Sequence, residues 1–283
     1  MRTVASHTMQ LVTVATESFV PGACAMFASF LRFHPAFQGE LVVITDGLSV
    51  TAQASLRAVS PRIRTLQAGD DLLERIGRLE QSVPALSATS GRFLSLEALR
   101  PTGAERVLFC DSDTLFLAPI DRMFESDGDV TAAGDGCFLR GHARDRDTLA
   151  EVPRGPGQLN STFNAGIMLF GPGALTGKDF TTALAELSEQ RFSKQQGGLH
   201  DQAIYNVVFA DRLMRVDWSF NYLLKHRALI EQYEPVAPRN IRVLHFNQRT
   251  KPWNFSTGQV ATFGDPFRKW AAMQWLAAAQ IPS

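Results

Sequence analysis

The chain has few cysteines, no excess of either charge and no long uncharged apolar run. Its three cysteines, Cys24, Cys110 and Cys137, are widely spaced and form no CxxC pair. This disfavours a disulfide framework or a zinc knuckle and suits a reducing compartment. Lys and Arg total 28 and Asp and Glu total 28, so the formal net charge is zero. Proteins that neutralise nucleic-acid phosphates usually carry a basic surplus, so we expect no nucleic-acid partner.

No segment has the pattern of a signal peptide or of a membrane-spanning helix. Glu17 interrupts the apolar stretch that begins at Leu11, and we therefore expect no signal peptide. The longest uncharged, apolar-leaning stretch, 18–31, contains Pro21 and Gly22. It is shorter than the roughly 20 residues that a bilayer-spanning helix needs. We expect a cytoplasmic protein.

Length and composition are those of an ordinary globular protein. The chain has 283 residues, of which 45% are hydrophobic and 20% charged. At this length roughly three quarters of the unfolded surface can be buried without disulfides or a structural metal. We expect one large domain over 1–264 and a C-terminal helical extension over 265–283. The extension places Phe267, Trp270 and Ala271 on one side of the expected helix.

Short apolar runs alternate along the chain with stretches at helical spacing. The apolar runs predict buried strands at 11–15, 41–45, 62–66, 106–110, 130–133, 163–170 and 242–245. The helical stretches are 20–31, 51–59, 89–99, 178–189 and 201–209. This alternation predicts an α/β fold with a mainly parallel central sheet and helices on both faces. Ligands of such sheets bind beyond the carboxyl ends of the strands. Residues 134–162 show little periodicity and predict a long loop.

Two aspartates directly follow the predicted strand 106–110. Asp111 and Asp113 flank Ser112, and residues i and i+2 of an extended chain point the same way. Both carboxylates would then face one point beyond the strand, where a hard divalent cation takes oxygen ligands. Aspartates also end strands for local hydrogen-bonding reasons, so the pair alone leaves both explanations open.

One other class of enzyme has a similar pair. Haloacid-dehalogenase-type phosphatases also place Asp-x-Asp after an apolar strand, near the start of the chain, with Thr or Val two residues after the second Asp. Here Leu115 occupies that position and the motif lies well inside the sequence. A phosphatase is therefore the less favoured alternative.

A second polar cluster ends the predicted strand 242–245. His245 could join the two aspartates, and an imidazole ligand favours Mn²⁺, with Mg²⁺ as the second possibility. Lys251, six residues further on, would then lie where it can neutralise a metal-bound diphosphate. Pro252 and Trp253 would stiffen the loop that carries this lysine.

These motifs together resemble glycosyltransferase family 8, retaining enzymes that use nucleotide sugars and include glycogenin and bacterial lipopolysaccharide galactosyl- and glucosyltransferases. The resemblance runs from about Leu11 to Asn254 and rests on the ordered occurrence of five motifs. They are Val14-Ala-Thr-Glu17, Val107-Leu-Phe-Cys-Asp-Ser-Asp-Thr114, Phe163-Asn-Ala-Gly-Ile-Met168, His200-Asp-Gln202 and the run from His245 to Asn254. The resemblance implies a single GT-A-type, Rossmann-like domain.

The resemblance also implies roles for individual residues. Asp111, Asp113 and His245 match the family's metal ligands, and Lys251 matches the lysine that contacts the donor diphosphate. The other positions that it assigns to the donor site are Ala15, Thr16, Phe19, Arg92, Ser112, Asp135, Asn164 and Gly166.

Asp201 and Gln202 match the family's pair beneath the anomeric carbon, so we expect them to be catalytic. One position departs from the family pattern. A glycine usually lies between the metal-binding His and the Lys, where the backbone approaches the diphosphate, and here Asn247 and Gln248 stand there. This departure keeps open a non-catalytic nucleotide-sugar-binding protein on the same scaffold.

The function implied by the resemblance is transfer of a hexose, glucose or galactose, from a UDP-sugar to an acceptor hydroxyl with a divalent metal. The acceptor would be a saccharide, a glycolipid or a protein. Arg268 and Lys269 are the only basic residues of the C-terminal extension. We therefore expect its helix to pack on the core rather than on a membrane surface.

Overall fold

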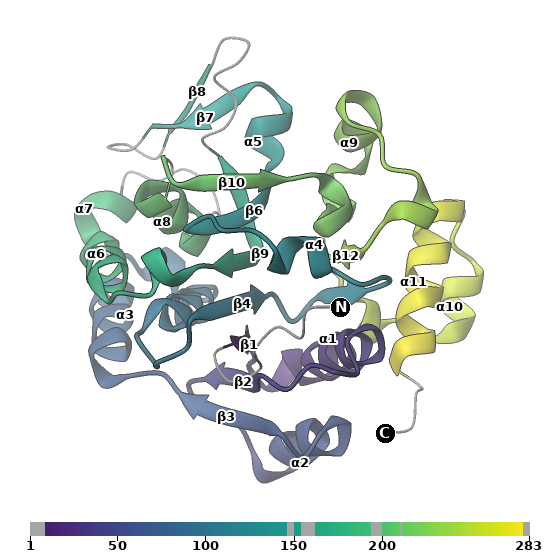
Figure 1. The fold of residues 1–283 in the computed structure, drawn as a ribbon, viewed down its shortest axis with the longest axis horizontal. Coiled ribbons are helices and arrows are strands. Elements are labelled where there is room, and N and C mark those ends of the chain that lie inside the picture. Colours follow the sequence, from purple (N-terminus) through teal and green to yellow (C-terminus); the bar gives the residue numbers. More distant parts are fainter. Residues whose placement is uncertain (1–8, 146–149, 154–161, 194–199, 210, 280–283) are drawn as a thin grey trace.

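The computed structural model describes residues 9–145, 150–153, 162–193, 200–209 and 211–279, which form an α/β fold around one large sheet (Figure 1). The sheet has seven strands in the order β10-β6-β9-β4-β1-β2-β3. The strands are β1 (Met9–Val14), β2 (Glu40–Thr45), β3 (Ile63–Gln67), β4 (Arg106–Cys110), β6 (Val130–Gly134), β9 (Phe163–Phe170) and β10 (Leu213–Val216). Only β9 runs antiparallel to its neighbours in this sheet. The expected α/β class and mainly parallel sheet are confirmed.

Helices cover both faces of the sheet (Figure 1). The α-helices of the described chain are α1 (Val20–Phe33), α2 (Val50–Val59), α3 (Asp70–Ser82), α4 (Asp121–Phe124), α5 (Gly136–Leu139), α6 (Lys178–Glu186), α7 (Glu189–Phe192), α8 (His200–Phe209), α9 (Arg227–Tyr233), α10 (Thr257–Ala261) and α11 (Pro266–Ala279). Short 3-10 helices are η1 (Glu17–Phe19), η2 (Pro84–Leu86), η3 (Ser90–Leu99), η5 (Pro172–Ala174), η6 (Trp218–Phe220), η7 (Leu224–His226), η8 (Pro238–Asn240) and η9 (Pro252–Asn254).

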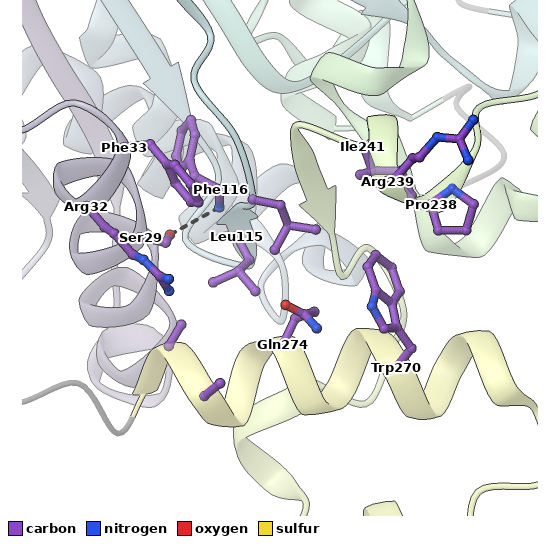
Figure 2. Close-up of a pocket in the computed structure, with 13 residues that line it drawn as sticks. Ser29, Arg32, Phe33, Leu115, Phe116, Pro238, Arg239, Ile241, Trp270 and Gln274 are labelled. Carbon is purple, nitrogen blue, oxygen red and sulfur yellow. Dashed lines mark hydrogen bonds between the residues drawn. The ribbon is translucent and has the colours of Figure 1, made fainter.

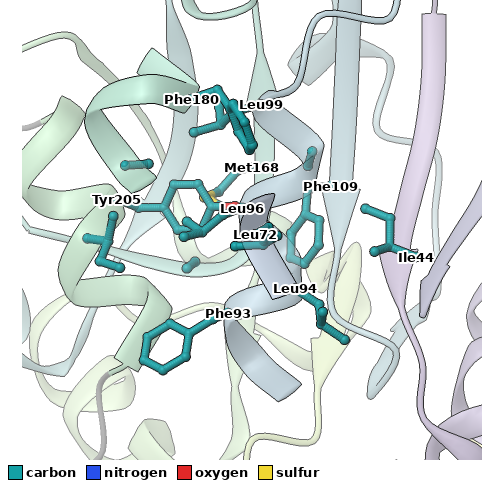
Figure 3. Close-up of a cluster of buried hydrophobic side chains, with 14 of the residues drawn as sticks. Ile44, Leu72, Phe93, Leu94, Leu96, Leu99, Phe109, Met168, Phe180 and Tyr205 are labelled. Carbon is teal, nitrogen blue, oxygen red and sulfur yellow. The ribbon is translucent and has the colours of Figure 1, made fainter. Parts of the chain in front are cut away.

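The apolar strands divide their side chains between two cores because successive residues point to opposite faces. Val12 and Phe109 face the core that η3, α3, α6 and α8 cover. Figure 3 shows Phe109 in this core with Leu72, Phe180 and Tyr205. Leu11 and Leu108 face the core that α1 and α2 cover. A strand that is buried on both faces needs apolar residues at successive positions. This is why short apolar runs in the sequence predict such strands.

Two local expectations differ from the structure. Residues Ser90–Leu99 form the 3-10 helix η3 rather than an α-helix. Nearly all of η3 is buried, so it has no exposed polar face of the kind that an amphipathic α-helix has. We attribute its 3-10 geometry to packing against α3, α6 and α8. The segment predicted as a loop contains α5 and a small hairpin of β7 (His142–Arg144) and β8 (Glu151–Pro153). Its residues 146–149 and 154–161 lie outside the described chain.

A second, three-stranded sheet joins distant parts of the chain. It consists of β11 (Tyr222–Leu223), β12 (Val243–His245) and β5 (Thr114–Phe116), in that order. Strand β12 runs antiparallel to β5, with His245 opposite Thr114. The end of the predicted strand 242–245 is thereby fixed beside the residues that follow β4.

The C-terminal helix α11 packs on the protein core. Its Ala271, Trp275 and Ala278 are buried in a cluster with Leu115 and Leu244. Within the described part of the chain, no helix has both the length and the hydropathy needed to cross a membrane.

We predict that Trp275→Ala will lower the free energy of unfolding by about 3–5 kcal/mol, because it empties a site in which the indole is only 3% exposed. The matched control is Met273→Ala in the same helix, where the side chain is 44% exposed and the expected change is within about 0.5 kcal/mol. Urea unfolding followed by circular dichroism measures both. Equal losses would mean that α11 does not pack as described.

Candidate active site

The residues expected to form a site meet at one edge of the central sheet. The carboxyl ends of β1, β4 and β6 lie at this edge, and the antiparallel β9 brings its first residues there as well. The register pairs Gly134 with Phe163 and Cys110 with Ile167. The Asp111 N–H also donates to the Gly166 carbonyl at 2.7 Å. The start of β9 therefore lies directly beside the first aspartate.

The two aspartates occupy a tight turn between β4 and β5. Both the N–H of Thr114 (3.1 Å) and its hydroxyl (2.8 Å) donate to the Asp111 carbonyl, which closes the turn. The extended backbone that we assumed for these residues is therefore wrong, although the expected convergence of the carboxylates is found. Nε2 of His245 lies 3.2 Å from Asp113 Oδ1 and 3.5 Å from Asp111 Oδ2.

Strand pairing places His245 at this turn. The residue opposite it in β5 is Thr114, and the Phe246 N–H donates to the Asp113 carbonyl at 2.9 Å. One ligand atom from each of Asp111, Asp113 and His245 lies within 4.8 Å of the other two. His245 Nδ1 contacts the Asn221 amide oxygen at 2.9 Å, which leaves Nε2 directed at the carboxylates. Two carboxylates and one imidazole are a suitable donor set for a first-row divalent cation, so these residues fit a metal ion.

The two carboxyl groups differ strongly in electrostatic environment. Desolvation and the charge of Asp113 raise the pKa of Asp111 to about 7, against the opposing effects of His245 and Arg92. Burial disfavours ionisation of Asp113, but contacts with His245 and Lys251 outweigh it and lower the pKa of Asp113 to about 2. Asp113 is thus the member of the pair that ionises more readily.

Lys251 contacts the same cluster from the loop after β12. Its ammonium donates to Asp113 Oδ2 and, at 3.0 Å, to the Phe246 carbonyl. It lies 5.8 Å from the ring centroid of Phe19, and Phe19 meets Trp253 edge-on at 5.4 Å. Lys251 and Phe19, predicted from separate motifs, are therefore neighbours.

Four other expected donor-site residues differ in exposure. Ala15 is fully buried in the protein core, whereas Thr16 is half-buried. Ser112 is buried in the turn. Arg92 is exposed, and its positive charge lowers the pKa values of Asp111 and Asp201, so the structure places it on the same side as the carboxylates.

The expected catalytic pair begins helix α8. Asp201 is half-buried, accepts a hydrogen bond from the Ser95 hydroxyl at 2.9 Å, and has a pKa raised by burial. The Gln202 amide donates to Asp135 Oδ2 at 2.8 Å and accepts from Asn164 Nδ2 at 2.9 Å. The structure therefore brings Asp135, Asn164 and Gln202 into one hydrogen-bonded group.

Sequence reasoning missed two residues that support this site, Ser95 and Asn221. Ser95 contacts Asp201, and Asn221 is 1% exposed between His245 and Asn164. A signal for Asn221 was present, because it interrupts the aromatic run from Trp218 to Tyr222. A buried amide in such surroundings needs hydrogen-bond partners.

A cavity of about 280 Å³ lies elsewhere, between α1, β5 and α11 (Figure 2). Ser29, Phe33, Trp270 and the exposed Arg32 are among its lining residues, and none of the residues expected at the site lines it. It is therefore a feature separate from the carboxylate cluster.

Comparison with known proteins agrees with this geometry. A family model described as glycosyl transferase family 8 matches residues 10–257. Glycogenin-1 of Oryctolagus cuniculus is 26% identical over 263 residues, covering 87% of this chain and 65% of that protein. Glycosyltransferase GlyF of Streptococcus pneumoniae is 24% identical over 202 residues, covering 70% of this chain and 45% of that protein. The chain thus spans less than two thirds of the length of either relative.

Solved structures with the same fold are glycosyltransferases. Galactosyltransferase LgtC, solved with donor and acceptor sugar analogues, has a TM-score of 0.63 at 18% identity, covering 96% of this chain and 95% of that one. Glycosyltransferase GlyE of Streptococcus pneumoniae has a TM-score of 0.60 at 16% identity, covering 97% of this chain and 61% of that one. These likenesses confirm the expected GT-A-type fold.

We predict that Gly166→Ala will displace the imidazole of His245. A Cβ at residue 166 would stand 2.1 Å from His245 Cε1, so the ring or the strand must move, at a cost of about 1–3 kcal/mol. Gly77→Ala is the control, because a Cβ at that interior position of α3 meets nothing within 4 Å and alanine favours helix by about 0.5–1 kcal/mol. Urea unfolding should show opposite signs; stabilisation by both substitutions would contradict the close approach at Gly166.

We also predict acid sensitivity from His200. Burial, with a smaller effect of Arg92, lowers the pKa of His200 to about 4 from an ordinary 6.5. The unfolded chain therefore binds an extra proton as pH falls from about 6.5 to about 4, and up to about 3 kcal/mol of stability is lost over that window. Urea unfolding of His200→Phe across this range should show a correspondingly smaller loss. Measurement at pH 7.5, where the ring is neutral in both states, isolates the packing effect; an unchanged pH slope would contradict the prediction.

Proposed function

Because the chain belongs to glycosyltransferase family 8, we propose that it transfers a hexose from a UDP-sugar to an acceptor hydroxyl and keeps the α-configuration at the anomeric carbon. The observation that carries this proposal is the convergence of Asp111, Asp113 and His245 at one point, with Lys251 on the same carboxylate. Glucose and galactose are the hexoses to test first. The family assignment leaves no support for the phosphatase alternative.

Asp111, Asp113 and His245 would hold the divalent cation, for which we propose Mn²⁺ first and Mg²⁺ second. Carboxylate oxygens suit both ions, and the imidazole nitrogen favours manganese. When bound, the cation would stabilise the negative charge that develops on the leaving diphosphate.

Lys251 would contribute a second positive charge to the diphosphate. Its ammonium is already at the edge of the cluster, where Asp113 Oδ2 and the Phe246 carbonyl accept its hydrogen bonds. A diphosphate oxygen is an equivalent acceptor for a charge-assisted hydrogen bond. Asn247 fixes the start of this loop, because its side-chain oxygen accepts from the Lys225 N–H at 2.9 Å. Gln248 follows it and is half-buried.

Asp201 is the residue that we propose faces the positively charged anomeric carbon. The Gln202 amide oxygen already accepts from Asn164 Nδ2 at 2.9 Å and from the Ala165 N–H at 3.4 Å. The carboxyl group of Asp201 lies near enough to Asp111 to raise the pKa of Asp111, and the Ser95 hydroxyl positions it. Gln202 would then shape the sugar pocket with Asp135 and Asn164 rather than act on the carbon.

Thr16, Phe19, Arg92 and Ser112 are proposed to complete the donor site, with Phe19 along the uracil ring. Ala15 would contribute only backbone atoms, because its side chain is fully buried. The acceptor would be a saccharide, a glycolipid or a protein. The packing of α11 on the core gives no reason to propose membrane-surface association.

We predict that Asp113→Asn will reduce donor turnover by about 10²–10³-fold, because it removes the negative charge that would bind the cation and that pairs with Lys251. Mass spectrometry of released UDP, with UDP-glucose and UDP-galactose and with Mn²⁺ added or chelated, measures this. Asp121→Asn is the control, because that carboxylate is 71% exposed in α4. Full turnover in Asp113→Asn, or turnover unaffected by chelation, would refute the metal site.

The same assay separates the enzyme from the non-catalytic alternative. Donor binding by the wild-type protein with no UDP release against a broad acceptor panel would favour a nucleotide-sugar-binding protein. The half-buried Gln248 would then be the first residue to replace with glycine.

A further inference from the structure

A continuous line of side-chain hydrogen bonds connects the sugar-pocket residues to the metal-site imidazole. It runs from Asp135 to Gln202 (2.8 Å), to Asn164 (2.9 Å), to Asn221 (2.9 Å) and to His245 (2.9 Å). Asp135 is the N-cap residue of α5, directly after β6, and the other four residues come from α8, β9, the segment between η6 and β11, and β12. Apart from the half-buried Asn164, all of them are buried.

Asp135, at the end of the line away from His245, determines which group donates and which accepts in each hydrogen bond. An ionised carboxylate only accepts hydrogen bonds. Asp135 Oδ1 accepts from the Phe138 N–H at 2.8 Å, and Asp135 Oδ2 meets the Gln202 side chain. Gln202 must therefore turn its NH₂ group to Asp135 and its oxygen to Asn164.

Two backbone groups confirm the same direction independently. The Ala165 N–H points at Gln202 Oε1 (3.4 Å), and the Gly166 N–H points at Asn164 Oδ1 (3.0 Å). A backbone N–H only donates, so the atoms that face these groups must be oxygens. Asn164 therefore donates to Gln202 and accepts from Asn221.

The orientation of the Asn221 amide determines which atom faces the imidazole of His245. Its NH₂ group is committed to Asn164 Oδ1, so its oxygen faces His245 Nδ1. An oxygen acceptor requires a proton on Nδ1. The lone pair of a neutral ring then lies on Nε2, which faces Asp113 Oδ1 at 3.2 Å and Asp111 Oδ2 at 3.5 Å.

We propose that Asn221 is a positioning residue that holds His245 in the Nδ1–H tautomer, and that the line of amides from Asp135 fixes the orientation of Asn221. This inference rests on the proposed function, because it assigns His245 as a ligand through Nε2. Hydrogen-bond partners of the non-coordinating ring nitrogen fix the tautomer and ring orientation of metal-binding histidines. An apolar side chain at 221 would leave the Nδ1–H without a partner and both tautomers accessible.

The first experiment is Mn²⁺ titration by isothermal calorimetry on the full chain without donor. Asn221→Leu should weaken Mn²⁺ affinity about 10–100-fold. Asn221→Asp keeps an oxygen for the Nδ1–H but loses the NH₂ donor to Asn164 Oδ1, so it should lose less Mn²⁺ affinity than Asn221→Leu. Asn240→Leu, at an exposed position in η8, is the matched control and should bind as wild type. Equal losses in Asn221→Leu and Asn221→Asp, or wild-type affinity in Asn221→Leu, would overturn the proposal.

The second experiment reads the tautomer without metal or turnover. Long-range ¹H–¹⁵N spectra of ¹⁵N-histidine protein at pH 8.5 should show a proton on His245 Nδ1 in wild type and in Asn221→Asp, and a loss of Nδ1–H signal in Asn221→Leu. The His245 signals are assigned by their loss in His245→Gln. A wild-type ring protonated at Nε2 alone would overturn the proposal, even if Asn221→Leu does not fold. Absence of Mn²⁺ and Mg²⁺ binding in wild type would refute the proposed metal site and the ligand role of His245. The tautomer spectrum would then still decide the role of Asn221 as its hydrogen-bond partner.

Discussion

The antiparallel pairing of β12 with β5 is the constraint on which the site depends. It sets His245 opposite Thr114 and ties the Phe246 N–H to the Asp113 carbonyl. A slip of one residue in this register would turn the imidazole to the other face of the strand. The proposed metal ligands Asp113 and His245 are thus brought together by backbone hydrogen bonds between β5 and β12 and their flanking residues.

Beside this strand pair lie two carboxyl groups, those of Asp111 and Asp113, whose electrostatic environments differ. Asp113 has the contacts of His245 and Lys251 and stays ionised, whereas desolvation and its neighbour raise the pKa of Asp111 to about 7. Burial of such groups is costly without partners, and a cation between them would relieve the repulsion. Asp201 lies close enough to add to this concentration of negative charge, and Arg92 opposes it. The electrostatics therefore favour a positively charged ligand at the point where the family places its metal.

Much of the fold could be predicted because β1, β2, β4, β6 and β9 are buried on both faces and so appear as short apolar runs. The partly exposed edge strand β10 was not predicted. The Asp-Ser-Asp turn and His245 were identifiable for a similar reason, since each follows such a run. The turn geometry, the 3-10 winding of η3 and the role of Asn221 were not predictable. Each depends on contacts between segments far apart in the sequence. Asn221, for example, forms hydrogen bonds with Asn164 in β9 and His245 in β12, and neither is near it in the sequence.

The C-terminal helix α11 is connected to the candidate site through a series of aromatic contacts. Trp275 of α11 meets Trp253 edge-on at 5.8 Å. Trp253 belongs to η9, which begins directly after Lys251, and it also contacts Phe19 of η1. Gly22 leaves room for this indole, since a Cβ there would stand 2.6 Å from it. A protease that cut before Pro266 would remove the Trp275 ring on which Trp253 packs, whereas Asp111, Asp113, His245 and Lys251 would remain in the chain.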